Sequence, residues 1–326
     1  LGLGGLEDPV PVGTSIKSPE SVALPDNLLA ASVYAGAAHS MILTTDGCAY
    51  TFGYNARGQL GVGKRLEDCN IPTKVLGVGP KNPSNSSRWL SALLIQAGRK
   101  PPKVRGENRA AFGALGDQHS AILTDDGKIY MWGSCERGRC GIGDVKKHGP
   151  IILKPRLVQG ISHLSVVHLS LGRSHTVAVT DFHEVFSWGD GVMCPIGHPE
   201  RKIEWVPREI MALIGADVVK VECGEKHSIA LTKSGRVMTW GLGKYGRCGI
   251  SEGHEKDVQK PRVVDSLLGK RVIQVSAGRD FNWAIDSENT YYSFGHGYYG
   301  ALGSGFNSDR HIAVPSTIDP WGVTET

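Results

Sequence analysis

Apolar residues fill short segments of this chain at nearly every position, without the alternation expected of a half-exposed strand. In the stretch SMILTTDGCAYTFG, which starts at Ser40, an apolar run is followed by a short polar turn and a second apolar run. The turn pair Asp46-Gly47 has counterparts in Asp126-Gly127 and Ser234-Gly235, and such pairs favour the tight turn of a β-hairpin. Strands that are apolar on both sides are covered on both faces. The pattern therefore predicts hairpins buried between neighbouring sheets.

The hairpin pattern is repeated five times along the chain. Each copy begins with a leading glycine, at Gly36, Gly116, Gly172, Gly224 and Gly278. Seventeen residues later, every copy has a glycine preceded by Phe or Trp; these are Gly53, Gly133, Gly189, Gly241 and Gly295. Strands on a period of about 50 residues, with one aromatic-glycine pair per unit, are typical of propeller blades. The sequence thus predicts an all-β fold of four-stranded antiparallel blades.

The composition indicates many tight turns, reduced cysteines and an intracellular protein. The 326 residues include 43 glycines, as expected of a protein with many tight turns. The seven cysteines show no framework spacing and are interpreted as reduced thiols of an intracellular protein, with nucleus and cytoplasm both left open. No run of 18 apolar residues predicts a membrane span.

The positive charge of the chain is concentrated in one segment outside the repeats. The chain has a net charge of +4, but residues 77–110 contain seven basic residues against one acidic residue, Glu107, so the rest of the chain is net negative. The basic residues are Lys81, Arg88, Arg99, Lys100, Lys103, Arg105 and Arg109. A long basic loop on a rigid scaffold suits an acidic partner such as a nucleosome, RNA or an acidic protein patch. A solvated loop without a partner explains the same composition.

Two segments have the spacing Gly-x-Gly-x-x-Gly of a nucleotide-binding loop. They begin at Gly241 and at Gly295. A dinucleotide-binding loop also requires a preceding strand, a following helix and an acidic residue about 20 positions further on, and the sequence RCGISEGHEKD after the first segment is not helical. The first and last glycines belong to the repeat, whereas the middle one, Gly243, is absent from the first two copies and is interpreted as incidental. We therefore predict turn glycines and no nucleotide cofactor.

Four histidines share one position of the repeat: His39, His119, His175 and His227. One interpretation is a ring of imidazoles for a metal or for catalysis. Another is that each ring forms a hydrogen bond within its own blade, and a third is contact with a partner. Equivalent positions in adjacent blades lie too far apart for one metal shell, which needs ligands about 2 Å from the ion. The structural role is favoured, and no metal is predicted.

The aromatic residues and the cysteines have structural and chemical interpretations too. Phe52, Trp132, Trp188, Trp240 and Phe294 recur once per copy, either as a stacking platform for bases or, as we favour, as packing between blades. Cys135 and Cys140 lack a second pair at zinc-ligand spacing and are interpreted as core thiols.

The repeat resembles that of the regulator of chromosome condensation (RCC1-like) family. The first copy, AGAAHSMILTTDGCAYTFGYNARGQLGVG, is close to a consensus unit, and the resemblance extends over nearly the whole chain outside residues 77–110. It implies a seven-bladed propeller, of which five full units are recognisable here, with partial units at both ends of the sequence. We accordingly expect residues 1–326 to form a single propeller domain that carries a basic insertion.

The resemblance also implies the function classes. Members of the family serve as protein-interaction modules, and the founding member is a guanine-nucleotide exchange factor for a small GTPase that also binds nucleosomes. We expect a scaffold that binds a protein partner through its blade loops, with exchange on a Ran-like GTPase as the alternative. The sequence contains no nucleophile elbow, His-Glu-x-x-His motif or P-loop, and no small-molecule substrate is evident. Whether the protein is an enzyme is left undecided, because nucleotide exchange needs no covalent chemistry.

Candidate contact residues outside the basic segment lie in two kinds of loop. The resemblance implies that an exchange surface uses acidic residues just before the repeated histidine. Asp280 directly precedes this position in the last copy, where Phe281 replaces the histidine, and Asp117 lies two residues before His119. The other preceding residues are Ala38, Gln118, Ser174 and Lys226, which argues against exchange. Lys244 and Tyr245 lie between two repeat glycines at a variable loop tip and are the remaining candidates.

Overall fold

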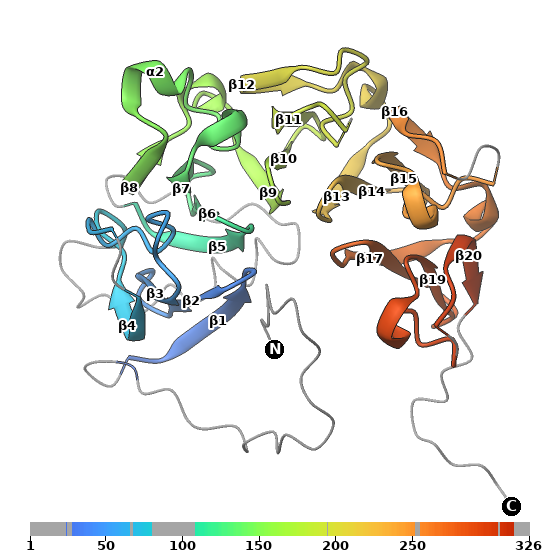
Figure 1. The fold of residues 1–326 in the computed structure, drawn as a ribbon, viewed down its shortest axis with the longest axis horizontal. Coiled ribbons are helices and arrows are strands. Elements are labelled where there is room, and N and C mark those ends of the chain that lie inside the picture. Colours follow the sequence, from blue (N-terminus) through green and yellow to red (C-terminus); the bar gives the residue numbers. More distant parts are fainter. Residues whose placement is uncertain are drawn as a thin grey trace, which may run out of the picture. The chain divides into compact units, whose positions relative to one another are not determined.

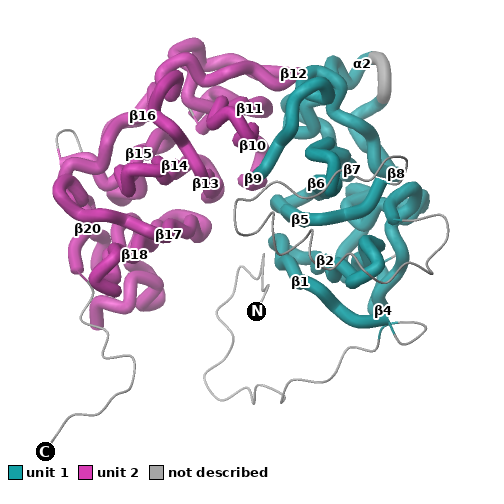
Figure 2. Tube along the Cα trace, turned by 180° about the vertical axis from the view of Figure 1, so that it is seen from behind, with its two compact units in different colours: residues 1–167 teal, residues 168–326 magenta. Residues whose placement is uncertain are grey.

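The structure is a computed structural model that describes residues 24, 28–65, 68–79, 108–193, 195–251, 255–305 and 307–315. These residues form two compact units, 1–167 and 168–326, which are described separately (Figure 2). The partial repeat at the start of the sequence lies outside the described residues, as do residues 316–326 of the one at its end. That the whole chain forms a single domain stays a prediction.

Unit 1 contains two four-stranded antiparallel sheets with the strands in sequence order (Figure 1). The first sheet consists of β1 (Ala30–Ala35), β2 (His39–Thr44), β3 (Ala49–Gly53) and β4 (Cys69–Lys74). The second consists of β5 (Ala110–Leu115), β6 (His119–Thr124), β7 (Ile129–Ser134) and β8 (Ile151–Leu157). Short helices α2 (Val145–His148), η2 (Glu136–Gly138) and η3 (Gln159–Ile161) occupy the connections.

Unit 2 contains three such sheets in sequence order, the first of which starts at the boundary between the units. The first consists of β9 (Val166–Leu171), β10 (His175–Thr180), β11 (Val185–Asp190) and β12 (Ile203–Glu209). The second consists of β13 (Val218–Cys223), β14 (His227–Thr232), β15 (Val237–Gly241) and β16 (Val258–Val263). The third consists of β17 (Val272–Ala277), β18 (Phe281–Asp286), β19 (Tyr291–Gly295) and β20 (Arg310–Pro315). The 3-10 helices η4 (Met211–Leu213), η5 (Lys244–Gly246), η6 (Asp265–Leu267) and η7 (Tyr298–Gly300) connect strands.

The five predicted hairpin units are thus confirmed as five antiparallel blades in the described chain. The hairpin between β2 and β3 turns at Gly47, whose φ of 82° lies in the left-handed region that favours glycine. The second strand of a blade is buried along its whole length in β6, β10 and β14, as the continuous apolar runs predict. Strand β18 differs, since its residues alternate between buried and half-buried. In unit 2, β17 of this last sheet lies against β13 and β14 of the preceding one.

Neighbouring blades within a unit are joined by a polar contact that recurs in both units. The indole Nε1–H of Trp240 donates to the backbone carbonyl of Pro195 at 2.8 Å, and the Ser228 hydroxyl donates to the same oxygen at 2.7 Å. His175 Nε2 lies 3.0 Å from the Ser228 oxygen. Because that hydroxyl already donates its proton to Pro195, the imidazole must be the donor. The histidine of one blade therefore donates a hydrogen bond to the serine hydroxyl of the next blade.

The same arrangement recurs in unit 1 around the carbonyl of Gln59. That oxygen accepts from Trp132 Nε1 at 2.8 Å and from the Ser120 hydroxyl at 2.7 Å, and His39 Nε2 lies 2.8 Å from Ser120. The prediction that the histidine bonds within its own blade is therefore wrong for His39, His175 and His227. Each of these residues begins the second strand of its blade, and its Nε2 atom lies against the following blade. As predicted, Trp132, Trp240 and Phe294 are fully buried and lie against the preceding blade. Trp188 is fully buried too, so these four rings cannot serve as a platform for bases, whereas Phe52 is half-buried.

The cysteines required one correction. Cys135 and Cys140 form a disulfide, with Cα atoms 5.0 Å apart, so the prediction of reduced thiols is wrong for this pair. The reason is local: the loop around η2 turns back on itself and brings two residues five positions apart into bonding range. Within the described parts of the chain, Cys48, Cys69, Cys223 and Cys248 form no disulfide.

The middle glycine of the Gly-x-Gly-x-x-Gly segments has a structural role as well. A Cβ atom at Gly243 would collide with the carbonyl oxygen of Lys256, and one at Gly297 would collide with that of Ser308. The interpretation of Gly243 as incidental is therefore wrong. Both segments lead into one-turn 3-10 helices, η5 and η7, which gives no support to a nucleotide-binding helix.

Candidate functional site on the loop face of unit 2

Two loops of a blade in unit 2, one after its first strand and one after its third strand, meet at the same end of the blade. Successive strands of an antiparallel sheet run in opposite directions. The loop between the first and second strands and the loop between the third and fourth strands therefore lie at the same end of the sheet. Backbone hydrogen bonds join them, from Leu242 N to Lys226 O and from His296 N to Asp280 O, both at 2.9 Å. We define the loop face of unit 2 as residues 172–175, 224–227, 242–249, 278–281 and 296–300.

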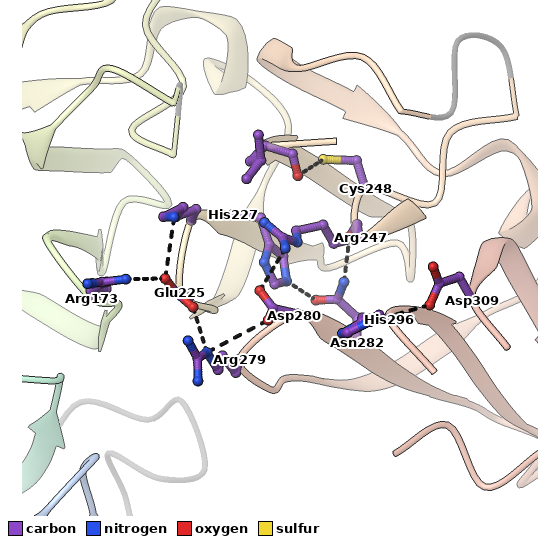
Figure 3. A network of polar contacts seen from close by, with 12 residues as sticks. Arg173, Glu225, His227, Arg247, Cys248, Arg279, Asp280, Asn282, His296 and Asp309 are labelled. Carbon is purple, nitrogen blue, oxygen red and sulfur yellow. Dashed lines mark hydrogen bonds and ion pairs between the residues drawn. The ribbon is translucent and has the colours of Figure 1, made fainter. Parts of the chain in front are cut away.

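A carboxylate on this face bridges two arginines, one from the blade before its own and one from the blade after it (Figure 3). Glu225 accepts from Arg173 Nη1 at 2.5 Å and from Arg279 Nε at 2.6 Å, one oxygen for each arginine. These three residues each follow the leading glycine of their copy, so the three blades present them in a row. The backbone supports the row, since Glu225 N donates to the Arg279 carbonyl at 2.7 Å. We call Arg173, Glu225 and Arg279 the bridged row.

The bridged row presents its positive charges to solvent and its negative charge inward. The side chains of Arg173 and Arg279 are 49% and 74% exposed, whereas that of Glu225 is 8% exposed. Burial raises the pKa of Glu225, but hydrogen bonds from Arg279 and Arg173 outweigh burial and lower the pKa to about 2. Lys226 lies beside the row, with its Nζ 3.5 Å from the carboxylate. The carboxylate therefore stays ionised and holds both guanidiniums at neutral pH.

A second group of polar and aromatic side chains continues from the row toward the 3-10 loops. Arg247 is buried and pairs with Asp280 at 2.9 Å, and Asp280 also lies 3.7 Å from Arg279 Nε. The Arg247 guanidinium is 5.4 Å from the centre of the Tyr245 ring, and Lys244 Nζ is 4.5 Å from it. Cation–π contacts of this kind orient the ring and the cations together.

The tyrosine at the loop tip is part of a short stack of rings. Tyr245 stacks on His296 with centroids 4.3 Å apart and planes at 19°, and His296 stacks on Tyr298 at 5.7 Å and 7°. Asp309 lies 3.8 Å from His296 Nε2 and accepts from Gly297 N at 2.9 Å. Tyr245 has a φ of 64°, an uncommon conformation for a residue other than glycine, so its backbone is held by the surrounding loop.

The structure brings some of the predicted contact residues together and separates others. Lys244, Tyr245 and Asp280 lie on the loop face, and Lys244 is exposed. Asp117 lies half-buried in the corresponding loop of unit 1. Six of the seven predicted basic residues, at 81–105, lie outside the described residues.

Arg109 is the one member of the basic segment that the structure describes. It is 3% exposed and donates from Nη2 to the carbonyl of Asp46 at 2.8 Å. It anchors the hairpin turn of the preceding blade and is not presented to a partner, so its assignment as a contact residue is withdrawn.

The bridged row was missed at the level of sequence, although the sequence contains a signal for it. The residue after the leading glycine is Ala37, Asp117, Arg173, Glu225 and Arg279 in the five copies, so the sign of the charge alternates in the last four. Register alone places these residues side by side, because each stands at one position of adjacent blades.

The loop face combines charged and aromatic side chains, several of them exposed. Among the described residues, no three His, Cys, Asp or Glu side chains are grouped so that they could hold a metal ion. No helix in the described parts of the chain is long and apolar enough to cross a membrane. Exposed arginines and tyrosines supply ion pairs and stacking, the contacts that dominate protein interfaces.

Comparison with known protein families places the repeats. Residues 96–325 match the RCC1-like domain, and residues 30–59 and 46–100 match regulator of chromosome condensation (RCC1) repeats. E3 ubiquitin-protein ligase HERC2 of Mus musculus is 33% identical over 307 residues, which is 94% of this chain and 6% of that protein. The ultraviolet-B receptor UVR8 of Arabidopsis thaliana is 27% identical over 311 residues, 95% of this chain and 61% of the receptor. The chain thus spans only part of each of these relatives.

Solved structures show the same fold. Human WBSCR16 superimposes with a TM-score of 0.71 at 22% identity, covering 92% of this chain and 71% of that one. Prp20p from Saccharomyces cerevisiae superimposes with a TM-score of 0.69 at 19% identity, covering 87% of this chain and 62% of that one. At these identities the likeness establishes the fold alone.

Proposed function

Given that the chain belongs to the RCC1-like domain family, we propose that it is a protein-interaction module that holds a protein partner on the loop face of unit 2. The observation that carries the proposal is the bridged row, in which two exposed arginines are fixed by a recessed carboxylate. An arginine held in place loses less side-chain entropy on binding than a free one. Arginine and tyrosine are also the residues most enriched at the energetic centres of protein interfaces.

Site-directed photocrosslinking tests this proposal. Benzoylphenylalanine placed at Lys226 or Lys244 lies on the loop face, and at Lys260 of β16 or Arg156 of β8 it lies on exposed strand positions elsewhere. We expect the same crosslinked protein from both loop-face positions in extracts of the source cells and none from the two controls. Equal crosslinking from all four positions, or from the controls alone, would contradict the proposal.

Guanine-nucleotide exchange remains an alternative hypothesis with less support. Prp20p is described as binding Gsp1p and histones, and the family resemblance implies an exchange surface with acidic residues near the repeated histidine. Here Asp280 is already paired with Arg247 and Arg279, and the exposed charges around it are basic. A release assay with labelled GDP on a panel of small GTPases decides the matter: acceleration would favour exchange over simple scaffolding.

The activities of the longer relatives are not transferred. HERC2 is a ubiquitin-protein ligase, but this chain corresponds to 6% of it. Binding of chromatin or RNA rests on the basic segment 77–110, of which 80–107 lie outside the described residues. It is tested below by excision of that segment.

A further inference from the structure

We propose that the bridged row is a receptor for an acidic linear segment of the partner, in which Asp or Glu carboxylates bind the guanidiniums of Arg173 and Arg279. This inference rests on the proposed function and specifies the chemistry of the partner. A linear segment is favoured because three blades contribute to the row from equivalent positions, so the cationic groups follow one another along a line.

Charge complementarity is the first argument. The cationic side chains at and beside the row are the exposed ones: Arg173 at 49%, Arg279 at 74% and Lys226 at 37%. The carboxylates are recessed, with Glu225 at 8% and Asp280 at 19%. A ligand that approaches this surface meets basic groups first. Guanidinium groups bind carboxylates through two parallel hydrogen bonds, which gives direction as well as attraction.

Preorganisation is the second argument, and it assigns a role to Glu225. This residue is a positioning residue: it binds one arginine on each carboxylate oxygen and fixes the spacing of the two guanidiniums. Asp280 gives Arg279 a second neighbouring carboxylate, and Arg247 holds Asp280 from the buried side. The binding groups are therefore ordered before the ligand arrives, which lowers the entropy lost on association.

A nucleic acid fits this face less well than a peptide does. A base platform beside the row needs open ring faces, but Tyr245 is stacked on His296 and has Lys244 and Arg247 near its ring. The exposed rings of the loop face, Tyr298 and Tyr299, lie in η7 and not in the bridged row. A continuous phosphate backbone would also pass close to the carboxylates of Glu225, Asp280 and Asp309. Spaced carboxylates on a peptide can match the arginines and avoid these acids.

The test is fluorescence anisotropy with the full chain and a labelled 12-residue probe of alternating Glu and Gly. A probe with Gln in place of Glu and a single-stranded oligonucleotide of equal net charge serve as ligand controls. We expect Arg173→Ala and Arg279→Ala each to weaken binding of the Glu probe by about tenfold, as for loss of a charge-assisted pair. Arg156→Ala, an exposed arginine of β8 outside the loop face, should leave it unchanged.

Glu225→Gln distinguishes a built receptor from a diffuse basic surface. The substitution removes a negative charge, so simple attraction predicts tighter binding of the acidic probe. Loss of positioning predicts weaker binding, by about fivefold or more, with an unchanged circular dichroism spectrum. Arg279→Lys keeps the charge but loses the planar fork, and it should also weaken binding. If Glu225→Gln does not fold, this second variant decides.

Several results would overturn the inference. The Glu probe could bind Glu225→Gln as tightly as the parent chain or more tightly, or it could bind Arg279→Lys with unchanged affinity. The parent chain could also fail to bind the Glu probe, or bind the oligonucleotide or the Gln probe with the same affinity. The crosslinking experiment distinguishes failure of the acidic-segment hypothesis from failure of the proposed interaction module. If the loop-face crosslinks persist and an excess of Glu probe does not compete with them, the interaction module stands and the acidic partner does not.

Discussion

At the scale of single residues, the repeated histidine is the clearest case of a group whose role is set by burial. Burial lowers the pKa of His39 to about 4, of His175 to about 3 and of His227 to about 4. Each ring is neutral in the folded chain and its Nε2 atom donates to the next blade. The acceptor is a serine hydroxyl for His39 and His175 and the side-chain oxygen of Asn282, at 3.0 Å, for His227. These residues are structural hydrogen-bond donors, and protonation would place an uncompensated charge between blades.

The histidines make stability depend on pH in a defined window. Their pKa is lower in the folded chain than in the unfolded chain, where it is about 6.5, so the unfolded state binds protons first as pH falls. Their contribution is therefore complete above about pH 6.5 and is lost as pH falls toward 4, by about 1.4 kcal/mol per pH unit for each histidine. Urea unfolding from pH 7 to pH 4.5 measures this slope.

A variant identifies the source of the slope. His227→Gln keeps an amide donor toward Asn282 and cannot titrate, so its stability should fall less steeply in this window than that of the parent chain. Glu225 contributes to the slope only near the lower end of this window, because its pKa is lowered from 4.5 in the unfolded chain to about 2 in the folded chain. The slope above about pH 5.5 therefore reports the histidines. A parent chain whose stability is flat between pH 6.5 and 4.5 would contradict the prediction.

Gly243 provides a second residue-scale prediction. Gly243→Ala should lower the free energy of unfolding by about 2 kcal/mol, because the new Cβ must displace the Lys256 carbonyl. The neighbouring Lys244→Ala, at an exposed position, should change it by less than about 0.5 kcal/mol. Equal midpoints for the two variants in urea would restore the view of this glycine as incidental.

At the scale of elements, blades are joined by a carbonyl that receives two donors from the next blade. Pro195 O accepts from both Trp240 and Ser228, so the loss of one donor leaves the other. The sequence predicts that the aromatic side chain packs between blades, but it gives no sign of this shared acceptor. The carbonyl belongs to a different copy, and only the stacking of blades brings the three groups together.

A double-mutant cycle measures this contact. Trp240→Phe and Ser228→Ala should each destabilise unit 2 by roughly 1–2 kcal/mol, and together they should cost more than their sum, because only the double variant leaves the Pro195 carbonyl buried without either donor. The matched pair Trp132→Phe and Ser120→Ala around Gln59 repeats the test in unit 1. Strict additivity in both cycles would show that the two donors act independently.

The Cys135–Cys140 disulfide belongs to the same scale, since it closes a single loop. A loop this short contributes about 2 kcal/mol through the lost entropy of the unfolded chain. Reduction with dithiothreitol should therefore lower the urea midpoint of the parent chain and leave a Cys135→Ser, Cys140→Ser double variant unaffected. Mass spectrometry of unreduced peptides checks the bond directly, and a parent chain with both thiols free to alkylation would refute it.

At the scale of the whole molecule, the basic insertion leaves and re-enters the fold at one place. Gly79 N donates to the carbonyl of Asn108 at 2.8 Å, and Asn108 Nδ2 lies 3.4 Å from the carbonyl of Gly77. The two ends of the excursion are therefore adjacent, so the blades on either side do not depend on its length. A long insertion is tolerated at such a site because loop closure becomes more costly only slowly with length.

This geometry predicts that the insertion can be removed. Replacement of residues 80–107 by Gly-Ser should leave the thermal midpoint within a few degrees of the parent value, while the excised segment takes away six basic residues and one acidic residue. If the segment binds nucleic acid, salt-dependent binding to RNA or nucleosomes should be lost with it. Binding of the acidic probe to the bridged row should persist. Nucleic-acid binding that survives the excision would rule out the insertion as its source.

The sequence by itself determined the repeat, the strands and their turns. Leading glycines, aromatic-glycine pairs and unbroken apolar runs are local signals, since each follows from what one strand or turn requires of its own residues. They were sufficient to predict four-stranded antiparallel blades of the RCC1-like type. They were also sufficient to assign Gly241 and Gly246 to turns, because the same glycines recur in register.

Only the tertiary structure decided which residues meet. The bridged row, the shared carbonyls and the requirement for glycine at position 243 all join groups that lie far apart in sequence or in different copies. The disulfide joins neighbours whose approach depends on how one loop folds back. Hydrophobic pattern carries no information on such pairings, because it specifies which face of a strand is covered and not which side chain of the next blade covers it. The candidate site is therefore a product of register between blades.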